Sequence, residues 1–174
     1  MPQIMTEWNK SRAFLGLGGN LESPLERFRQ ARQHLATHPQ IGLLSSSPLY
    51  RTPPVGGPQG QPDYLNAVLE IETSLSAELL LQICQQLETA AGRTRDVHWG
   101  PRTLDIDLLL FGELICTDRR LTLPHPRLHH RHFVLLPLND LAPQLQHPLL
   151  QTTVRQLLTA LSPAAGIVRI CDTW

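Results

Sequence analysis

Two amphipathic helical segments, each enclosed between strand-like segments, constrain the fold of this chain more than any other feature of its sequence. In the helical segments apolar residues recur at helical spacing, whereas in the strand-like segments they alternate or form short runs. The order strand, helix, strand, strand, helix, strand predicts an α+β fold with a ferredoxin-like, split βαβ core, in which an antiparallel sheet is packed with helices. In chain order these segments are strand 13–18, helix 24–37, strands 41–50 and 64–73, the helix from Ser76 to Gly92, and strand 103–111.

Serine residues mark the expected start of both helices. Ser23 is a candidate N-cap for the first helix, with Pro24 in the first helical position and Glu26 in the acidic first turn. Ser76 is the equivalent candidate for the second helix. We expect Gly92 to end that helix, because glycine readily adopts the left-handed conformation found at helix C-termini.

The segments outside this core are shorter or irregular. Segment 51–63 is rich in proline and glycine and predicts a long loop of the kind that is usually either functional or disordered. A short hairpin around Ile115 and Leu121, a C-terminal helix within 152–161 and a terminal strand at 167–170 are expected additions. We expect the C-terminal part to pack on the core through an apolar set made of Leu149, Val154, Leu157, Leu158 and Leu161.

Composition limits the partners and the compartment. The 174 residues suit one domain, predicted over 13–174 after a flexible extension over 1–12. The 15 basic and 15 acidic residues leave no net charge to attract nucleic acid, and no apolar segment is long enough to cross a membrane. Three scattered cysteines predict reduced thiols rather than a disulfide framework. We therefore expect a cytoplasmic protein without a nucleic-acid or membrane partner, and we predict that it is a monomer.

Asp105 and Asp107 are the strongest chemical signal in the chain. Residues two apart in a strand face the same side, so the two carboxylates point together while Leu104, Ile106 and Leu108 face the other side. Paired carboxylates in an apolar strand need a neutralising partner, and Mg²⁺ prefers one or two carboxylates together with phosphate oxygens. The pattern predicts a site for two Mg²⁺ ions that clamp a phosphoryl group in transfer. The alternative is a strand with one solvated face, where the aspartates simply meet water.

Arginines are dense around this strand, and their guanidinium groups match phosphate geometry while staying charged. They are Arg93, Arg95 and Arg102 before the aspartates and Arg119, Arg120, Arg127 and Arg131 after them, with His125 in the second group. We interpret Arg119 and Arg127 as ordinary surface charges. Segment 16–20 does not match a phosphate-binding P-loop, so side chains and metal ions are expected to hold any polyphosphate. Its glycines are expected to allow a turn or the close approach of backbone to a ligand.

A set of motifs in a fixed order narrows the interpretation further. They are YRTPP at 50–54, QPDYLN at 61–66, Glu88 with GRTR at 92–95, WGPRTLDID at 99–107, PHP at 124–126 and RHFVL at 131–135. With these motifs, the chain from about Ala13 to about Pro143 resembles the 6-hydroxymethyl-7,8-dihydropterin pyrophosphokinases of folate biosynthesis. The resemblance implies transfer of a diphosphate group from ATP, as co-substrate, to the hydroxymethyl group of the pterin, giving AMP and the pterin diphosphate.

The resemblance also implies a role for each matching residue. Asp105 and Asp107 would ligate both Mg²⁺ ions, and with Arg93 and Arg102 they would form the catalytic set. Glu88 would orient an arginine. The residues expected to bind ATP are Arg93, Arg95, Trp99, Arg102, Arg120, His125 and Arg131. The residues expected to bind the pterin are Thr52, Pro53, Pro54, Val55, Tyr64, Asn66 and Phe133, with Phe133 as the stacking face and Asn66 reading the hydrogen-bonding edge.

Four positions depart from the usual pattern of that family. Gly19 stands where serine is usual, Pro126 where some members carry tyrosine, and the histidines at 129 and 130 where a basic contact would be weaker or pH-dependent. Two other functions stay open on the residues alone. One is a non-catalytic ferredoxin-like nucleotide-binding module, and the other is an ATP-using transferase with a different acceptor. A zinc site made of the histidines between 125 and 132 is disfavoured by their irregular spacing and by the absence of a nearby cysteine.

Overall fold

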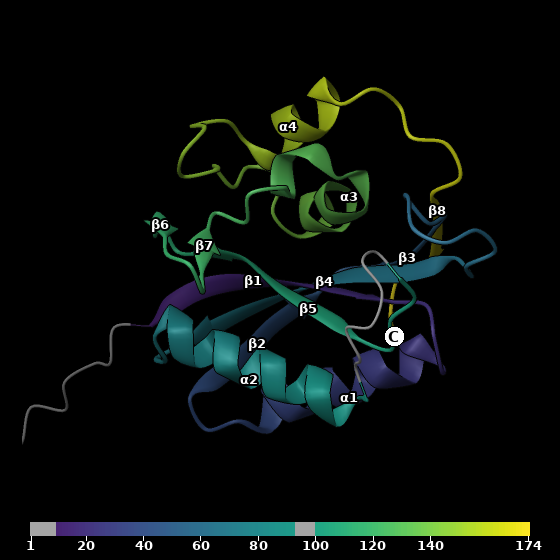
Figure 1. Ribbon diagram of the computed structural model, residues 1–174. Helices are drawn as coiled ribbons and strands as arrows, with labels where there is room; N and C mark the ends of the chain where they lie inside the picture. Colours follow the sequence, from purple (N-terminus) through teal and green to yellow (C-terminus); the bar gives the residue numbers. More distant parts are fainter. Residues whose placement is uncertain (1–9, 93–99) are drawn as a thin grey trace, which may run out of the picture.

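A computed structural model describes residues 10–92 and 100–174. It has a twisted antiparallel sheet with two helices on each face (Figure 1). Along the chain the elements are β1 Ser11–Gly19, α1 Pro24–Thr37, β2 Ile41–Ser46, β3 Leu49–Thr52, β4 Tyr64–Thr73, α2 Ala77–Ala90, β5 Asp105–Phe111, β6 Cys116–Thr117, β7 Thr122–Leu123, the 3-10 turn η1 Leu128–His130, α3 His132–Leu141, α4 Val154–Ala160 and β8 Val168–Cys171. None of the described helices is long and apolar enough to span a membrane.

The sheet confirms the ferredoxin-like prediction. Its strands lie in the order β5-β1-β4-β3-β8, and β2 also pairs with β4. Every pairing is antiparallel, and the two helices of the core connect β1 to β2 and β4 to β5. Strand β1 begins two residues earlier than the predicted strand 13–18, and β5 begins two residues later than the predicted strand 103–111. Most of the expected extension over 1–12 lies outside the described residues.

The predicted strand 41–50 is wrong as a single element, because it divides into β2 and β3 at Ser47 and Pro48. Proline has no N–H to donate to a strand ladder. Ser47 replaces part of the lost pairing: its backbone N–H donates to the carbonyl oxygen of Val68 at 2.9 Å, and its hydroxyl oxygen accepts from the N–H of Val68 at 2.8 Å. Both strands therefore stay on β4, one along each half of it.

Helices α1 and α2 cover one face of the sheet and enclose the larger apolar core. The Ser76 cap is confirmed, since its hydroxyl accepts from the backbone N–H of Leu79, and Gly92 follows α2 with a φ of 77°. The Ser23 cap is wrong. Ser23 has a left-handed backbone with a φ of 58°, and its side chain makes no capping hydrogen bond. The start of α1 depends instead on Pro24 and on the carbonyl oxygen of Ser23, which accepts from the N–H of Glu26 at 3.0 Å.

Helices α3 and α4 cover the other face, and the first of them was not predicted from the sequence. They enclose a second, smaller core around Phe14, Leu109 and Leu135. The predicted C-terminal helix is confirmed as α4, whose capping box joins Thr153 and Gln156. The apolar set predicted for this part packs as expected except for one member. Val154 is buried and Leu157, Leu158 and Leu161 contact the second core, whereas Leu149 is 61% exposed.

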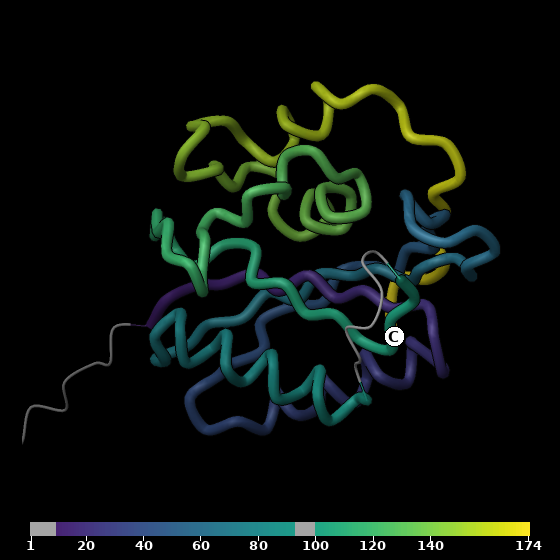
Figure 2. The backbone as a smooth tube through the Cα atoms, viewed as in Figure 1, coloured from purple at the N-terminus to yellow at the C-terminus, as the bar shows by residue number. Residues whose placement is uncertain are grey.

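The chain after α4 crosses one end of the molecule and returns to the sheet as β8, beside β3 (Figure 2). Trp174 then enters the larger core, where its ring lies edge-on to Phe28 and its indole N–H donates to the carbonyl oxygen of Ser47 at 2.8 Å. The predicted hairpin is confirmed as β6 and β7, at the opposite end of the molecule. The C-terminal part therefore ties the α4 layer to the sheet.

Candidate active site

A cavity of about 900 Å³ lies between the sheet and the first turn of α3. Its floor is formed by β5, β1, β4 and the end of β3, side by side in the sheet. We call the part over β5 the charged side, because it holds Arg102, Asp105, Asp107, His125 and Arg131. We call the part over β4 and β3 the apolar side, which is lined by Thr52, Pro53, Val55, Tyr64 and Asn66. Phe133 of α3 also lines the cavity.

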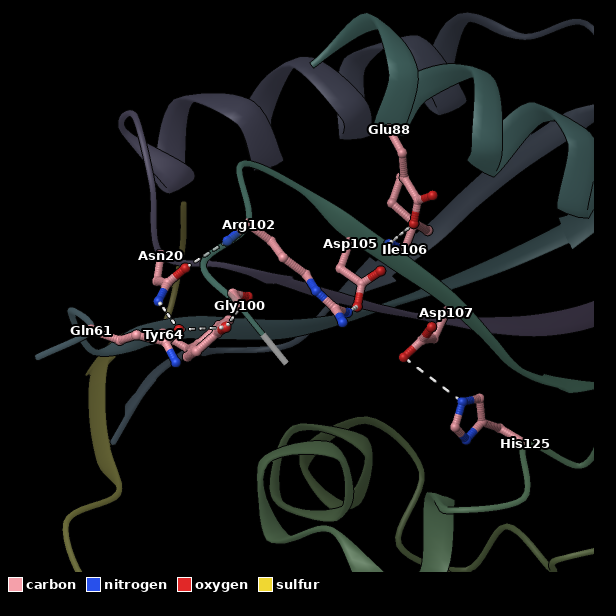
Figure 3. A network of polar contacts seen from close by, with 10 residues as sticks. All are labelled: Asn20, Gln61, Tyr64, Glu88, Gly100, Arg102, Asp105, Ile106, Asp107 and His125. Atoms are coloured by element: carbon pink, nitrogen blue, oxygen red, sulfur yellow. Dashed lines mark hydrogen bonds and ion pairs between the residues drawn. The ribbon is translucent and has the colours of Figure 1, made fainter. Parts of the chain in front are cut away.

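The predicted alternation of β5 is confirmed. Asp105 and Asp107 face the cavity, whereas Ile106 between them is buried in the larger core (Figure 3). The neighbouring strand β1 places Gly18 opposite Asp105 and Gly16 opposite Asp107. Both glycines line the cavity, so the strand beside the carboxylates presents backbone and no side chains. This is the close approach of backbone that the glycines of 16–20 predicted.

A β-bulge in β5 positions His125. Leu15 pairs with Leu108 and Phe14 with Leu110, which leaves Leu109 as the extra residue. The carbonyl oxygen of Leu109 accepts a hydrogen bond from the backbone N–H of His125 at 2.9 Å. The imidazole Nε2 of His125 then lies 3.8 Å from Oδ2 of Asp107. The irregular strand thus brings the segment after β7 next to the second aspartate.

Arg102 is fixed on the other side of the aspartate pair. Its Nη1 donates to Oδ2 of Asp105 at 2.6 Å, an ion pair that neutralises part of the paired charge. Its backbone is held by Asn20, which is buried in the turn after β1: the N–H of Arg102 donates to Oδ1 of Asn20 at 2.8 Å, and the N–H of Asn20 donates to the carbonyl oxygen of Arg102 at 2.9 Å. Asn20 Nδ2 also donates to the carbonyl oxygen of Pro62 at 3.1 Å. The side-chain amide of Asn20 therefore links the turn after β1 to the loop before β4 and to the loop before β5, at the edge of the cavity (Figure 3).

Gly19 belongs to the same turn. A Cβ at this position would lie 2.7 Å from the carbonyl oxygen of Thr103, closer than side-chain carbons approach backbone oxygens. Glycine at position 19, where serine is usual in the family, lets the turn after β1 lie close to the loop that carries Arg102. Tyr64 holds the same loop from the sheet, because its hydroxyl donates to the carbonyl oxygen of Gly100 at 3.0 Å.

Glu88 supports the aspartates from behind. It is buried on α2, on the face of the sheet opposite the cavity, and its Oε1 accepts from the backbone N–H of Ile106 at 2.7 Å. Figure 3 shows Glu88 on one side of β5 and the two aspartates on the other. Because Ile106 is the residue between the aspartates, this hydrogen bond fixes the strand at the point where both carboxylates leave it. The expected partnership of Glu88 with an arginine stays a prediction.

Electrostatics on the charged side favour an anion. Burial, with the positive charges of Arg131 and Arg127 nearby, lowers the pKa of His125 to about 4. His125 is therefore neutral at pH 7, and its approach to Asp107 is a polar contact rather than an ion pair. Burial also lowers the pKa of Arg131, whose guanidinium carbon lies 5.4 Å from the centre of the Phe133 ring. Arg102, Arg127 and Arg131 together surround the aspartates with cationic groups.

The apolar side has a fixed polar group of its own. Asn66 is buried on β4, and its Nδ2 donates to Oγ1 of Thr52 at 2.7 Å. This bond leaves Oδ1 as the acceptor, which lies near Gly18 in the cavity floor. Val55 is 77% exposed at the mouth of the cavity. A flat ligand with N–H donors on one edge would match this arrangement.

The sequence comparison decides the family. Residues 14–143 match the family described as 7,8-dihydro-6-hydroxymethylpterin-pyrophosphokinase. The chain belongs to this family. A pyrophosphokinase of Haemophilus influenzae, named 2-amino-4-hydroxy-6-hydroxymethyldihydropteridine pyrophosphokinase, is 43% identical over 78% of this chain and 84% of its own length. Proteins of the same name from Methylorubrum extorquens and Pseudomonas aeruginosa are both 42% identical, over 92% and 91% of this chain and 99% and 96% of their own lengths.

Solved structures that contain this family's fold support the same architecture. Plasmodium falciparum HPPK-DHPS, wild type, superposes with a TM-score of 0.65 over 86% of this chain and 44% of that chain, at 16% identity. An HPPK-DHPS in complex with substrates gives 0.69 over 87% of this chain and 43% of that one, at 13% identity. This chain spans less than half the length of those proteins. At such low identity the likeness shows the pyrophosphokinase fold alone.

The structure brings together most of the site residues expected of a pyrophosphokinase. Eleven of them line the cavity: Thr52, Pro53, Val55, Tyr64, Asn66, Arg102, Asp105, Asp107, His125, Arg131 and Phe133. Pro54 and Arg120 are not among the residues that line it, and Arg120 is exposed in the turn between β6 and β7. The predictions for Arg93, Arg95 and Trp99 lie outside the described residues. The roles of all these residues stay predictions.

Sequence reasoning missed several residues of the site. Arg127, interpreted as a surface charge, lines the cavity, as does His130. Asn20 was not assigned a role, although its place directly after a strand and two glycines could have indicated a loop contact. Nothing in the local sequence indicated the three residues contributed by the C-terminal part, which are Ala164, Ala165 and Ile167.

The donor set suits Mg²⁺ better than zinc. Among residues 10–92 and 100–174, no group of three or more His, Cys, Asp or Glu side chains is arranged to hold a metal ion. Asp105 and Asp107 offer two carboxylates on one face, next to cationic side chains that attract phosphate. Mg²⁺ is commonly bound in this way, by one or two carboxylates completed by substrate phosphates and water. The residues present therefore fit the ion that the sequence predicted.

Proposed function

We propose that this protein transfers the diphosphate group of ATP to the hydroxymethyl group of 6-hydroxymethyl-7,8-dihydropterin, giving AMP and the pterin diphosphate for folate biosynthesis. The observation that carries the proposal is one cavity with two complementary sides. Paired carboxylates among arginines lie over β5, and an oriented amide with apolar walls lies over β4 and β3. The two sides are separated by β1 alone, which is about 10 Å across two strand spacings. The relatives' names supply the pterin acceptor and the pyrophosphate transfer.

The charged side would bind the triphosphate of ATP. Asp105 and Asp107 would hold two Mg²⁺ ions, which would supply charge neutralisation at the phosphates. Arg102 and Arg131 would contact phosphate oxygens where negative charge develops in the transition state, and neutral His125 would donate or accept a hydrogen bond without adding charge. Further ATP contacts are proposed for Arg93, Arg95, Trp99 and Arg120.

The apolar side would bind the pterin. Its ring would stack on Phe133, and its N–H edge would donate to Oδ1 of Asn66, which Thr52 holds in the acceptor orientation. Pro53 and Val55, with the adjacent Pro54 and with Tyr64, would contact the remaining ring edges. Burying a heterocycle against a fixed acceptor discriminates against rings that lack the matching donor.

The chemistry is a substitution at the β-phosphorus of ATP. The hydroxymethyl oxygen forms a bond to that phosphorus, the bond between it and the oxygen bridging to the α-phosphorus breaks, and AMP leaves with the bond's electrons. The hydroxyl gives up its proton to solvent water as the new O–P bond forms. No described side chain is placed as a dedicated base, so the protein contributes mainly alignment and charge stabilisation. Glu88, through Ile106, keeps the aspartates in register for this alignment.

A product assay tests the proposal. The purified protein is incubated with ATP, Mg²⁺ and 6-hydroxymethyl-7,8-dihydropterin, and nucleotides are separated by chromatography. We expect AMP to form in equal amount to the pterin diphosphate, and no AMP without the pterin. ADP in place of AMP would mean a simple kinase. ATP binding without pterin-dependent turnover would support the binding-module alternative, and turnover with another acceptor alone would support a different transferase. Removing Mg²⁺ with a chelator should abolish turnover.

We also propose that residues 13–174 form one domain that works as a monomer in the cytoplasm. Both apolar cores contact the same sheet, and the C-terminal part contributes to the larger one through Trp174. The three cysteines are unpaired, as expected in a reducing compartment. Light scattering coupled to gel filtration measures the mass in solution, and a dimer mass would contradict the monomer.

A further inference from the structure

The C-terminal segment 162–167 reaches the cavity from outside the ferredoxin-like core. It joins α4 to β8, and its residues Ala164, Ala165 and Ile167 line the cavity. Figure 2 shows this part of the chain passing from α4 to the edge of the sheet beside the loop that follows β3. The three lining residues are apolar: Ala164 and Ala165 are small and exposed, and Ile167 is larger and half-buried.

The sheet register places this segment on the apolar side. In the antiparallel pairing of β3 with β8, Arg51 lies opposite Val168. Continuing that register by one residue brings Ile167 next to Thr52, the residue that holds Asn66. Gly166 lies against the same loop, since a Cβ at this glycine would be 3.2 Å from Cγ of Pro53. The segment therefore borders the residues that surround the fixed acceptor, and it lies four strands from Asp105.

Both ends of the segment are anchored. On one side, Leu161 packs on the smaller apolar core with α4. On the other side, β8 pairs with β3, and Nη1 of Arg169 lies 3.7 Å from Oδ1 of Asp140 on α3. Trp174 is buried beyond β8. A segment held at both ends and against Pro53 acts as a wall with a defined position.

We propose that segment 162–167 forms the outer wall of the pterin-binding side of the cavity, and that Ala164 and Ala165 set the largest ring substituent that an acceptor can carry. This inference rests on the proposed function. The alanine methyl groups offer apolar contact to the edge of a flat heterocycle and leave room for it. A longer side chain at either position would occupy that room. ATP, on the charged side, would be unaffected.

Leucine substitutions test the wall. Ala164→Leu and Ala165→Leu are compared with Ala160→Leu, a matched change at an exposed position of α4 that does not line the cavity. Dissociation constants are measured by fluorescence titration for 6-hydroxymethyl-7,8-dihydropterin and for a non-hydrolysable ATP analogue, with KM and kcat from the AMP assay. We expect the pterin dissociation constant and KM to rise about ten-fold or more in the wall variants, because the leucine side chain would occupy the room that the alanine leaves for the bound ring.

The controls separate this proposal from the proposed function. The ATP analogue should bind all variants as it binds the wild type, which also shows that they are folded, and Ala160→Leu should leave the pterin constants unchanged. If both wall variants bind the pterin as the wild type does, and the wild type is active, the wall proposal is wrong and the proposed function stands. A wild type that neither binds nor turns over the pterin would overturn both proposals. Equal loss of pterin and ATP-analogue binding would also overturn the wall, because it would indicate a general disturbance.

Discussion

The two faces of the sheet use the same strands in different ways. On the α1 and α2 face, the side chains form one continuous apolar core. On the α3 and α4 face, an apolar core fills only part of the surface, and the remainder is the open cavity. Strand β5 shows the contrast within one element, because Ile106 points into the first face while Asp105 and Asp107 point into the second. Strand alternation therefore lets one short sequence serve stability and chemistry separately.

This separation means that substitutions on the two faces should have different signatures. Changes on the α1 and α2 face, apart from Glu88, should alter the free energy of unfolding while each folded molecule keeps its activity. Changes at the cavity should alter binding or turnover while the unfolding transition stays in place. A substitution that moved both equally would show that the two faces are coupled.

Asp107→Ala is the sharpest test of the cavity face. Its side chain faces the cavity and contributes nothing to either apolar core, so the thermal unfolding midpoint should be close to that of the wild type. Loss of a carboxylate that we propose to hold Mg²⁺ at the transferring phosphates should lower kcat by on the order of 10²–10³-fold. AMP formation and differential scanning fluorimetry measure the two quantities. Wild-type turnover in this variant would remove Asp107 from the catalytic set.

Leu80→Ala is the corresponding test of the opposite face. Leu80 is fully buried on α2 in the larger core. Removing it should lower the free energy of unfolding by about 2–5 kcal/mol, from lost transfer energy and the cavity left behind. Urea denaturation followed by circular dichroism measures the loss. At a temperature where the variant is folded, its KM values should match the wild type, and a selective change in pterin KM would contradict the separation.

Phe133→Ala tests whether the two sides of the cavity bind different ligands. Stacking of a heterocycle on an aromatic ring contributes about 1–3 kcal/mol, so the pterin dissociation constant should rise about five-fold to more than a hundred-fold. Binding of an ATP analogue should change much less, although Arg131 lies over the same ring. Fluorescence titration with each ligand gives the ratio. An equal loss for both ligands would refute the stacking role.

Lowering the pH should reduce the stability of the α3 and α4 face before that of the α1 and α2 face. Three histidines gather there: the rings of His129 and His130 are 3.8 Å apart between centres, and His129 is 5.7 Å from His147. Burial and the adjacent His130 lower the pKa of His129 below its usual value, and burial and His129 lower the pKa of His147 in the same way. A depressed histidine pKa means that the unfolded state binds protons first, so this stability is present above about pH 6.5 and is lost as the pH falls below it.

Hydrogen exchange at pH 7.5 and pH 5.0, corrected for the intrinsic rate, would measure this effect. Protection should fall more in α3 and α4 than in α1 and α2. His147→Gln should reduce the difference between the two pH values, since His147 is the most buried member of the cluster. Equal loss of protection in all four helices would contradict the assignment of acid sensitivity to this face.

The smallest effect distinguishes two serines at the starts of α1 and α2. Ser76→Ala removes a capping hydrogen bond and should cost about 1 kcal/mol of unfolding free energy. Ser23→Ala removes no capping bond and should change stability by less than about 0.5 kcal/mol. The two variants are compared by urea denaturation under identical conditions. A larger loss for Ser23→Ala would mean that its hydroxyl caps α1 in solution.

The sequence predictions succeed where the pattern depends on residues that are close together in the chain. The helical periodicity, the alternation of β5 and the Ser76 cap depend on residues close together in the chain, and each is confirmed. The Ser23 cap was wrong because a residue's type does not reveal its backbone conformation. The strand 41–50 was predicted whole because the effect of Pro48 depends on its partner strand.

The parts of the site that could not be predicted come from distant segments. The role of Asn20 depends on loops more than 40 residues away in sequence, and Ala164 and Ala165 reach the cavity only through the pairing of β8 with β3. The aspartates and the surrounding arginines could be found because charge at fixed spacing in an apolar strand is visible locally. Small apolar residues in a C-terminal loop carry no such signal.

The bulge at Leu109 has a consequence for how this site can change during evolution. It lies beyond the two aspartates in β5, and its carbonyl oxygen carries the backbone of His125. An insertion or deletion at the bulge would shift His125 and the segment after it, while Asp105 and Asp107 kept their partners Gly18 and Gly16. Because Leu109 and Leu110 are buried in the smaller core and the bulge positions His125 beside Asp107, length variation among relatives should be absent at 109–110 as well as between 105 and 108.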